Sequence, residues 1–340
     1  MPEPFRVGVT HDFLKPDGTL GFGDIGLALL DEAPHVAWEF LAENTPVLRR
    51  EQIEGYDALL VLAPRITAET LRDNQRLQLI ARFGVGYDSV DVEACTANGV
   101  LVTITPDGVR RPVAVAIITF MLALSHNLLL KDRITREGRW GEKLDYMGVG
   151  LTGKTLGIIG LGNIGKEVLQ LVQPFEMRHL AYDPYVKRAA GVQMVTLDTL
   201  LRLSDFGVVC CALTPETHHL LDGERLALMK PTAYVINTAR GPIIDEAALT
   251  IALQERRIRG AALDVFEQEP LAPDHPLLTL DNVIVAPHAI CWTDECFLGV
   301  GRSACQSIVD VASGRRPRHI VNPEALNHPR FGALRETSPN

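Results

Sequence analysis

The sequence predicts an α/β protein made of two domains, each built on a doubly wound parallel sheet. The chain has 340 residues, which is more than one ordinary hydrophobic core accommodates, so two domains are expected. Short apolar runs alternate with segments that could be helical, which is typical of parallel strands covered by helices. From residue 151 this alternation restarts more clearly, as expected for a second domain.

The composition is that of a soluble globular protein, with 46% hydrophobic and 22% charged residues. The formal net charge of −9 argues against a nucleic-acid partner, because such binding depends largely on Lys and Arg that neutralise phosphates. One short basic cluster, Arg315, Arg316 and Arg318, is interpreted as solvated surface.

The cysteines and the N-terminus indicate a cytoplasmic protein. None of the six cysteines forms a Cys-x-x-Cys pair, so the sequence predicts no metal site and a reducing compartment. The first residues lack the basic and apolar regions of a signal peptide. The apolar run 113–130 approaches the length of a membrane span, but Ser125, His126 and Asn127 interrupt it, and we interpret it as a buried or interface helix.

The first part of the chain contains four apolar runs that predict strands, at residues 6–9, 58–62, 78–82 and 100–104. The segment 66–76 between two of these runs could be helical. A long helix follows Pro106 and Pro112, and a polar segment follows that helix. We expect the domain boundary near residue 105.

The second part contains six apolar runs that predict strands, at residues 156–160, 179–182, 206–213, 233–238, 261–266 and 283–287. Six strands separated by helical intervals are typical of a dinucleotide-binding domain. Residues 292–312 predict a last helix, and the tail from residue 322 is expected to be irregular.

A glycine motif supports the dinucleotide site. Gly160, Gly162 and Gly165 have the spacing G-x-G-x-x-G, directly after a predicted strand and directly before a helix. Asp183 ends the next predicted strand, where an acid can accept hydrogen bonds from ribose hydroxyls. Because a 2′-phosphate would meet this carboxylate, we expect NAD rather than NADP, a preference that the nearby Lys187 and Arg188 could soften.

Three ionisable residues follow three successive strands of the predicted second domain. These are Arg240, Glu269 and His288. Taken singly, they could be an ion-pair partner, a solvated acid and a histidine satisfied near a strand end. Side chains at the carboxyl ends of such strands face the cofactor crevice, so their joint placement favours catalysis. Arg can bind a carboxylate, His can move a proton, and Glu can orient the His.

Several motifs together resemble the D-isomer-specific 2-hydroxyacid dehydrogenase family. They are GIIGLGNIG, NTARGPIIDEAAL, GAALDVFEQEP and VAPHA, and residues 83–106 are similar to a loop of the family's substrate domain. The resemblance implies a Rossmann NAD-binding domain at residues 106–291. It also implies a discontinuous, flavodoxin-like substrate domain at residues 1–105 and 292–340, and a homodimer whose interface includes the helix at 112–131.

The resemblance also implies an activity. The family transfers a hydride between NAD and a small D-2-hydroxy or 2-keto acid, with glyoxylate or hydroxypyruvate reduction and 3-phosphoglycerate oxidation as candidates. An alternative is an NAD(H)-sensing binding protein of the same fold, similar to the family's corepressors. Formate dehydrogenases are disfavoured, because they resemble this pattern with Gln where Glu269 stands.

The resemblance assigns roles to residues. Arg240 would bind the substrate carboxylate and carbonyl, His288 would be the acid/base, and Glu269 its partner. The backbone at Val85 and Gly86 would also hold the carboxylate. Asn163, Ile164 and Thr217 would lie near the pyrophosphate and Asp264 near the nicotinamide amide. The expected cofactor contacts are Gly160, Gly162, Asn163, Ile164, Gly165, Asp183, Thr217, Thr238, Ala239 and Asp264.

Some of the chain departs from the family pattern. Ile290 stands where relatives commonly carry glycine, and Trp292 follows closely, so the two could reshape the substrate pocket. The first 50 residues, including the glycine-rich segment 17–26, match no pattern. Arg65 follows a predicted strand and could contact a substrate phosphate or a second carboxylate, although a plain surface role is favoured.

Overall fold

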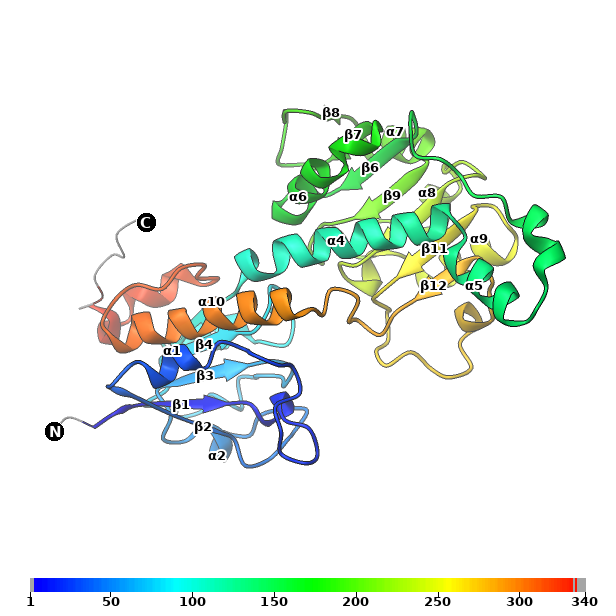
Figure 1. Cartoon of the computed structure of the whole chain (residues 1–340). Helices are drawn as coiled ribbons and strands as arrows, with labels where there is room; N and C mark the ends of the chain where they lie inside the picture. The colour runs from blue at the N-terminus through cyan, green and yellow to red at the C-terminus, as the bar shows by residue number, and fades with distance from the viewer. Residues whose placement is uncertain (1–2, 333, 335–340) are drawn as a thin grey trace. The chain divides into compact units, whose positions relative to one another are not determined.

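The computed structural model describes residues 3–332 and 334, and it divides the chain into two compact units (Figure 1). The first unit comprises residues 1–109 and 292–340, and the second comprises residues 110–291. The first boundary lies inside helix α4 (Pro106–Ser125), whereas the sequence placed it near residue 105. The difference arises because one continuous helix passes from one unit into the other.

The first unit contains a sheet of five parallel strands. Their order is β2 (Val36–Phe40), β1 (Phe5–Val9), β3 (Ala58–Val61), β4 (Leu79–Arg82) and β5 (Leu101–Thr103). This is the flavodoxin-like order, 2-1-3-4-5. The sequence predicted four of these strands and missed β2, an edge strand that pairs only with β1 and whose side chains are all partly or fully exposed.

Helix α10 (Asp294–Ala312) packs along β3 and β4 of this sheet (Figure 1). Shorter helices are α1 (Ala28–Asp31), α2 (Arg50–Ile53) and α3 (Val92–Ala97), with 3-10 turns η1 (His11–Phe13), η6 (Pro323–Asn327) and η7 (Pro329–Phe331). The tail from residue 322, expected to be irregular, thus contains two of these short turns.

The helix proposed for residues 66–76 was wrong, because this segment forms turns. The N–H of Thr67 donates to Thr70 Oγ1, and the N–H of Thr70 donates to Thr67 Oγ1. Thr70 Oγ1 in turn donates to the carbonyl of Leu48 at 2.6 Å. Threonine hydroxyls that bind nearby backbone groups in this way compete with helical hydrogen bonds.

The second unit contains a sheet of seven parallel strands. Their order is β12 (Val283–Val285), β11 (Gly260–Leu263), β10 (Tyr234–Asn237), β9 (Phe206–Val209), β6 (Thr155–Ile159), β7 (Arg178–Tyr182) and β8 (Gln193–Met194). The direction of the strand order reverses between β6 and β9, as in a Rossmann fold. The sequence predicted every strand except β8, which has only two residues.

The helices of the second unit are α5 (Leu128–Arg136), α6 (Asn163–Val172), α7 (Leu197–Leu203), α8 (Gly223–Leu226) and α9 (Glu246–Gln254), together with most of α4. Its 3-10 turns are η2 (Trp140–Tyr146), η3 (Gln173–Phe175), η4 (Gly241–Ile243) and η5 (Pro276–Thr279). Strands β6, β9, β10 and β11 are buried along their whole length, so the core of this unit lies on both faces of its central strands.

Helix α4 contains most of the apolar run 113–130, which approached the length of a membrane span. Within the described residues it is the one helix long and apolar enough to cross a membrane by length and composition, and 61% of its most apolar window is buried in the structure. The single helix expected at residues 112–131 is divided into two, because Asn127 adopts a left-handed conformation, with φ 53°, and α5 begins directly after it.

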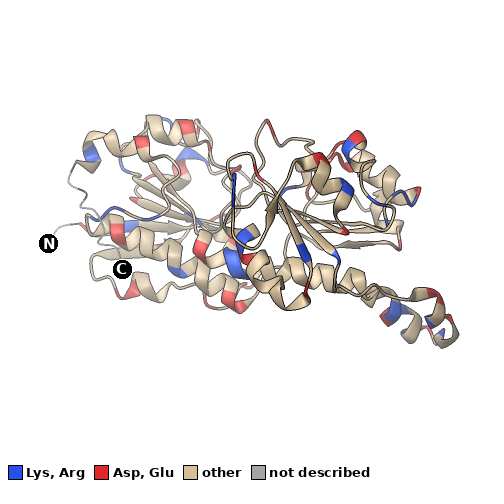
Figure 2. Ribbon diagram, turned by 90° about the horizontal axis from the view of Figure 1, so that it is seen from above, with Lys and Arg blue, Asp and Glu red and all other residues tan. Residues whose placement is uncertain are grey.

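Charged residues of both signs are interspersed along the ribbon (Figure 2). In the basic cluster near the C-terminus, Arg315 donates from Nε and Nη2 to Asp310 Oδ1, at 3.1 and 2.9 Å. Asp310 is only 6% exposed, so this arginine neutralises a buried acid of α10. Arg315 therefore has a structural role, in addition to its position at the surface.

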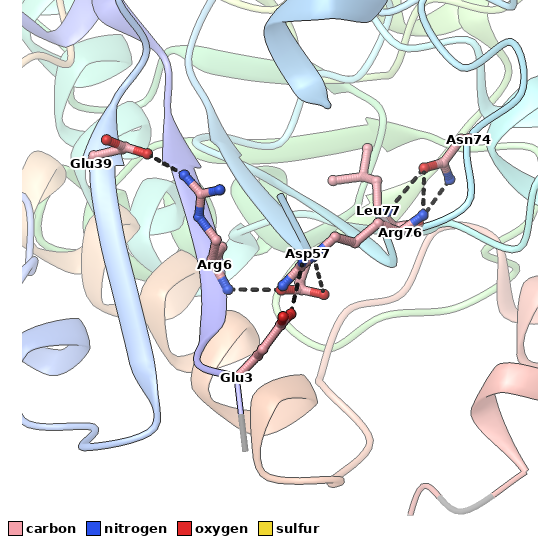
Figure 3. A network of polar contacts seen from close by, with 7 residues as sticks. All are labelled: Glu3, Arg6, Glu39, Asp57, Asn74, Arg76 and Leu77. Carbon is pink, nitrogen blue, oxygen red and sulfur yellow. Dashed lines mark hydrogen bonds and ion pairs between the residues drawn. The ribbon is translucent and has the colours of Figure 1, made fainter. Parts of the chain in front are cut away.

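A buried carboxylate connects the N-terminal ends of two strands of the first sheet (Figure 3). Asp57, which is 8% exposed and directly precedes β3, accepts the backbone N–H of Arg6 at 2.8 Å. Arg76 donates to both of its oxygens, at 3.1 and 3.0 Å. The side chain of Asn74 holds the turn that carries Arg76, accepting the N–H of Leu77 at 2.9 Å. Asp57 thus links the starts of β1 and β3 to the turn before β4.

We expect Asp57→Asn to lower the free energy of unfolding by about 1–3 kcal/mol, because the amide cannot accept a two-oxygen fork from Arg76. Glu39→Gln is the matched control. Glu39 pairs with Arg6 at 2.7 Å, but the two side chains are 55% and 44% exposed, and the loss should stay below about 1 kcal/mol. Urea unfolding of both variants measures the difference, and equal losses would contradict the role given to Asp57.

Candidate active site

The loop between β6 and α6 has three glycines with three different surroundings. Gly160 has φ 95°, and a Cβ there would lie 2.6 Å from the backbone nitrogen of Cys211. A Cβ on Gly165 would lie 2.5 Å from the carbonyl oxygen of Gly160. A Cβ on Gly162 would meet no atom within 4 Å, so its outer side is open. Because Gly162 directly precedes the ten-residue helix α6, this open side adjoins the N–H groups that bind a pyrophosphate.

Asp183 is fixed beside this loop by two backbone groups. Its Oδ2 accepts the N–H of Leu161 at 2.8 Å, and its Oδ1 accepts the N–H of Tyr185 at 2.9 Å. Each carboxylate oxygen has a further lone pair that can accept a ribose hydroxyl. Lys187 and Arg188 lie on the exposed segment that follows. The glycine loop and Asp183 together fit a bound dinucleotide.

The other expected cofactor contacts lie on the same edge of the second sheet. Asn163 and Ile164 begin α6. Thr217 follows β9, where its Oγ1 accepts the N–H of Thr214 and donates to the carbonyl of Ala212, both at 2.7 Å. The loops after β6 and β9 flank the point where the strand order reverses, which is where this fold binds its ligand. Thr238 and Ala239 follow β10 and are half-buried.

Arg240, Glu269 and His288 follow three neighbouring strands, β10, β11 and β12. His288 Nδ1 lies 2.7 Å from Glu269 Oε2, and Glu269 Oε1 accepts the N–H of Phe266 at 3.0 Å. Arg240 Nη1 donates to the carbonyl of Ala239 at 2.7 Å. The structure therefore brings the expected His–Glu pair into direct contact, beside the arginine.

The surroundings of Glu269 keep it ionised. Burial alone would raise its pKa, but hydrogen bonds from His288 and from the N–H of Phe266, and then the charges of His288 and Arg240, together lower it. The carboxylate is consequently ionised above its ordinary pKa of 4.5 and becomes neutral only as the pH falls below that value. At neutral pH it presents a full negative charge to His288.

Two residues that the sequence analysis missed set the position of Arg240. Asn237, which is 1% exposed, accepts the N–H of Ala239 and donates to the carbonyl of Arg240, at 3.0 and 2.9 Å. A Cβ on Gly241 would lie 1.9 Å from the carbonyl carbon of Phe266, so only glycine allows these two backbones to touch. The segment of Arg240 is thereby held against the segment that carries Glu269.

Asp264 binds two backbone groups that the sequence did not indicate as its partners. Its Oδ1 accepts the N–H groups of Ala289 and Ile290, at 2.9 and 3.2 Å. Burial raises its pKa, and these two N–H groups oppose that change. The bonds fix the turn that begins at His288, whose φ is 55°, in the left-handed region that few side chains adopt. Asp264, expected near the nicotinamide amide, therefore also anchors the turn that begins at His288.

A second polar network lies in the same region and was also missed. His219 Nε2 lies 2.8 Å from Glu267 Oε1, which also accepts the N–H of Glu246 at 3.1 Å. Glu246 Oε2 accepts the N–H of Glu267 at 3.1 Å, and Glu246 Oε1 lies 3.2 Å from His275 Nε2. The network connects the loop of Thr217, the start of α9 and the loop of Glu269. Only tertiary structure reveals it, because these residues are far apart in sequence.

Val85 and Gly86, expected to hold the substrate carboxylate, belong to the first unit, where they follow β4 and are half-buried. Buried Thr105 supports their loop: its Oγ1 accepts the N–H of Gly84, and its own N–H donates to the carbonyl of Gly84, both at 3.0 Å. Arg65 lies in the same unit and is exposed.

Comparison with known proteins identifies the family of the chain. Residues 118–289 match the family model described as the NAD-binding domain of D-isomer specific 2-hydroxyacid dehydrogenases. The chain is 39% identical over 315 residues to a glyoxylate reductase of Thermofilum pendens, covering 88% of this chain and 92% of that protein. It is also 39% identical over 291 residues to a D-3-phosphoglycerate dehydrogenase of Methanocaldococcus jannaschii, covering 84% of this chain and 55% of that one.

Among solved structures, the TT0316 protein of Thermus thermophilus is similar with a TM-score of 0.82 and 32% identity. The similarity covers 93% of this chain and 99% of that one. It thus includes both units, whereas the family model includes only residues of the second. The chain belongs to the D-isomer specific 2-hydroxyacid dehydrogenase family.

Proposed function

We propose that the protein is an NAD-dependent D-2-hydroxyacid dehydrogenase that interconverts a small 2-keto acid and its D-2-hydroxy acid. The observation that carries this proposal is the contact of His288 with Glu269. These two residues follow β12 and β11, and Arg240 follows β10, the next strand of the same sheet. The same sheet carries the glycine loop and Asp183, which fit the dinucleotide. Relatives named glyoxylate reductase and D-3-phosphoglycerate dehydrogenase support a substrate of this class.

Each residue has a distinct task in the proposed reaction. The nicotinamide, when bound, supplies the hydride for reduction of the substrate or accepts it during oxidation. The guanidinium of Arg240 binds the substrate carboxylate, with further N–H donors from the backbone at Val85 and Gly86. Protonated His288 gives its proton to the carbonyl oxygen during reduction and takes it back during oxidation. Glu269 holds the imidazole by Nδ1, which leaves Nε2 for the substrate.

We also propose that a second copy of the chain covers residues 128–147, from the start of α5 to the residue after η2. This segment exposes several large apolar side chains, with exposed fractions of 56% for Leu128, 65% for Trp140, 79% for Leu144 and 78% for Met147. Apolar groups gathered on one short segment are typical of a protein interface. Sedimentation velocity at micromolar concentration tests this, and a monomer mass would contradict it.

NADH is expected to be used at least about tenfold better than NADPH, because Asp183 would repel a 2′-phosphate. The measurement is kcat/KM for each cofactor with one keto acid. Asp183→Asn removes the negative charge. It should bring kcat/KM for NADPH closer to that for NADH, mainly by lowering the KM for NADPH. Equal use of both cofactors by the parent would instead make Lys187 and Arg188 the candidates for phosphate contacts.

Arg240→Lys should reduce kcat/KM for the keto acid by at least about a hundredfold while NADH still binds, since an ammonium cannot reproduce a two-pronged contact with a carboxylate. Arg225→Lys is the matched control, because Arg225 also donates Nη1 to a backbone carbonyl, that of Leu220, at 2.9 Å. NADH fluorescence titration and a panel of 2-keto acids give the two readings. Near-normal turnover by Arg240→Lys would return this arginine to a structural role.

Glu269→Gln should change the pH profile of the reduction. The lowered pKa of Glu269 means that its carboxylate is charged above that pKa and becomes neutral as the pH falls through it. The parent should therefore lose kcat/KM for reduction in that acid range, where the carboxylate no longer holds the imidazole of His288. Gln at position 269 has no charge to lose, so the variant should have a lower kcat/KM at neutral pH and should lack this acid limb of the profile.

Glu267→Gln is the control for this change in the pH profile. Glu267 lies two residues before Glu269 and also contacts a histidine, but that histidine is His219 and not His288. Its pH profile should match that of the parent. His288→Ala should abolish turnover and leave NADH binding intact. An unmoved profile in Glu269→Gln, or parental turnover in His288→Ala, would remove the proton-transfer role from this pair.

A further inference from the structure

Five aromatic side chains of the first unit form one connected cluster. Phe22 stacks on Phe297 with ring centroids 4.7 Å apart, and Trp292 meets both rings edge to face, at 5.2 and 5.3 Å. Phe83 lies 5.6 Å from Phe297 and 4.9 Å from Phe13. These rings come from the two chain segments of the first unit, so the cluster exists only in the folded domain.

The cluster has a buried part and an exposed part. Phe13, Phe83 and Phe297 are 0%, 5% and 6% exposed, as expected for core residues. Phe22 is only partly buried, and Trp292 is 50% exposed. The buried rings therefore support two aromatic side chains that remain accessible at the surface of the unit.

The glycine-rich segment 17–26, which matched no sequence pattern, forms a loop that is held at both ends and carries Phe22. Leu14 and Leu20 form an antiparallel bridge, and the N–H of Gly21 donates to the carbonyl of Phe13 at 2.8 Å. At the other end, a Cβ on Gly301 would lie 1.9 Å from the carbonyl oxygen of Ile25, so the loop is pressed against α10. Both ends of the loop are thus fixed, and Phe22 lies between them.

The cluster is placed where this fold binds ligands. Phe13 follows the end of β1 and Phe83 the end of β4, and ligands of doubly wound sheets bind outside the carboxyl ends of the strands. Phe83 is two residues from Val85, which the proposed function assigns to the substrate carboxylate. Trp292 is four residues from His288 along the chain.

We propose that Phe22 and Trp292 form a subsite for the substrate side chain, and that the preferred substrate is a 2-keto acid with an aromatic ring on C3. The inference rests on the proposed function and adds the substrate class. Aromatic rings at the surface of a binding site offer apolar area and edge-to-face contacts to a further ring. Glyoxylate has no side chain and gains nothing from such a subsite.

The test compares phenylpyruvate with glyoxylate, with NADH as the cofactor. The parent should have the higher kcat/KM for phenylpyruvate. Trp292→Ala and Phe22→Ala should each lower that value about tenfold, mainly through KM, and change kcat/KM for glyoxylate less than about twofold. Trp292→Phe keeps an aromatic face and should retain most of the phenylpyruvate activity. Thermal unfolding of every variant reports any loss of folded protein.

Trp38→Ala is the matched control, because Trp38 forms an edge-to-face pair with Phe40 at 5.5 Å on edge strand β2 of the same unit. It should leave the ranking of the two acids unchanged. Equal losses on both acids in Trp292→Ala would make the cluster purely structural, and a gain on phenylpyruvate would mean that the rings block the pocket. If the parent reduces glyoxylate but does not prefer phenylpyruvate, the aromatic subsite is overturned and the proposed function stands. Failure with every 2-keto acid overturns the proposed function too.

Discussion

The contact between the backbones of Gly241 and Phe266 is the constraint on which the geometry of the candidate site depends. Parallel strands β10 and β11 bring the segments after them to one edge of the sheet, but strand pairing alone does not fix how those segments approach each other. A glycine at 241 allows direct backbone contact, since any Cβ there would overlap Phe266. Asn237 fixes the turn on one side, and the N–H of Phe266 holds Glu269 on the other. One methyl group at this point would separate the parts of the site.

Much of the fold was predictable from sequence, because buried parallel strands are short and apolar throughout. Strands β6, β9, β10 and β11 are of this kind and were predicted. Strand β2 was missed because as an edge strand it carries partly exposed side chains, and β8 because two residues give no pattern. The helix proposed at 66–76 failed because mutual hydrogen bonds of Thr67 and Thr70 hold the segment in turns.

The site divides in the same way. Arg240, Glu269 and His288 could be found from their positions after successive strands, since the carboxyl edge of such a sheet faces the ligand. The residues that hold these three in position could not be found from sequence. Their role depends on which backbone group or side chain lies opposite them in the folded protein. Asp264 holds N–H groups 25 and 26 residues further along the chain, and Thr105 holds a loop 21 residues before it. Glu267 with His219 spans 48 residues. No spacing rule connects positions so distant.

The chain passes between its two units twice, and the two passages differ in structure. The first lies inside α4, between Val109 and Arg110 and close to Pro112, which has no backbone N–H to donate to the preceding turn. The second, between Cys291 and Trp292, lies just after the turn held by Asp264 and just before Thr293, which caps α10 by accepting the N–H of Cys296 at 3.1 Å. The second passage is therefore short and has a fixed backbone on both sides, the turn bonded to Asp264 before it and the capped start of α10 after it. The hydrogen bonds that orient His288 all come from residues of its own unit, so the pair of His288 and Glu269 is built without any group from the other unit.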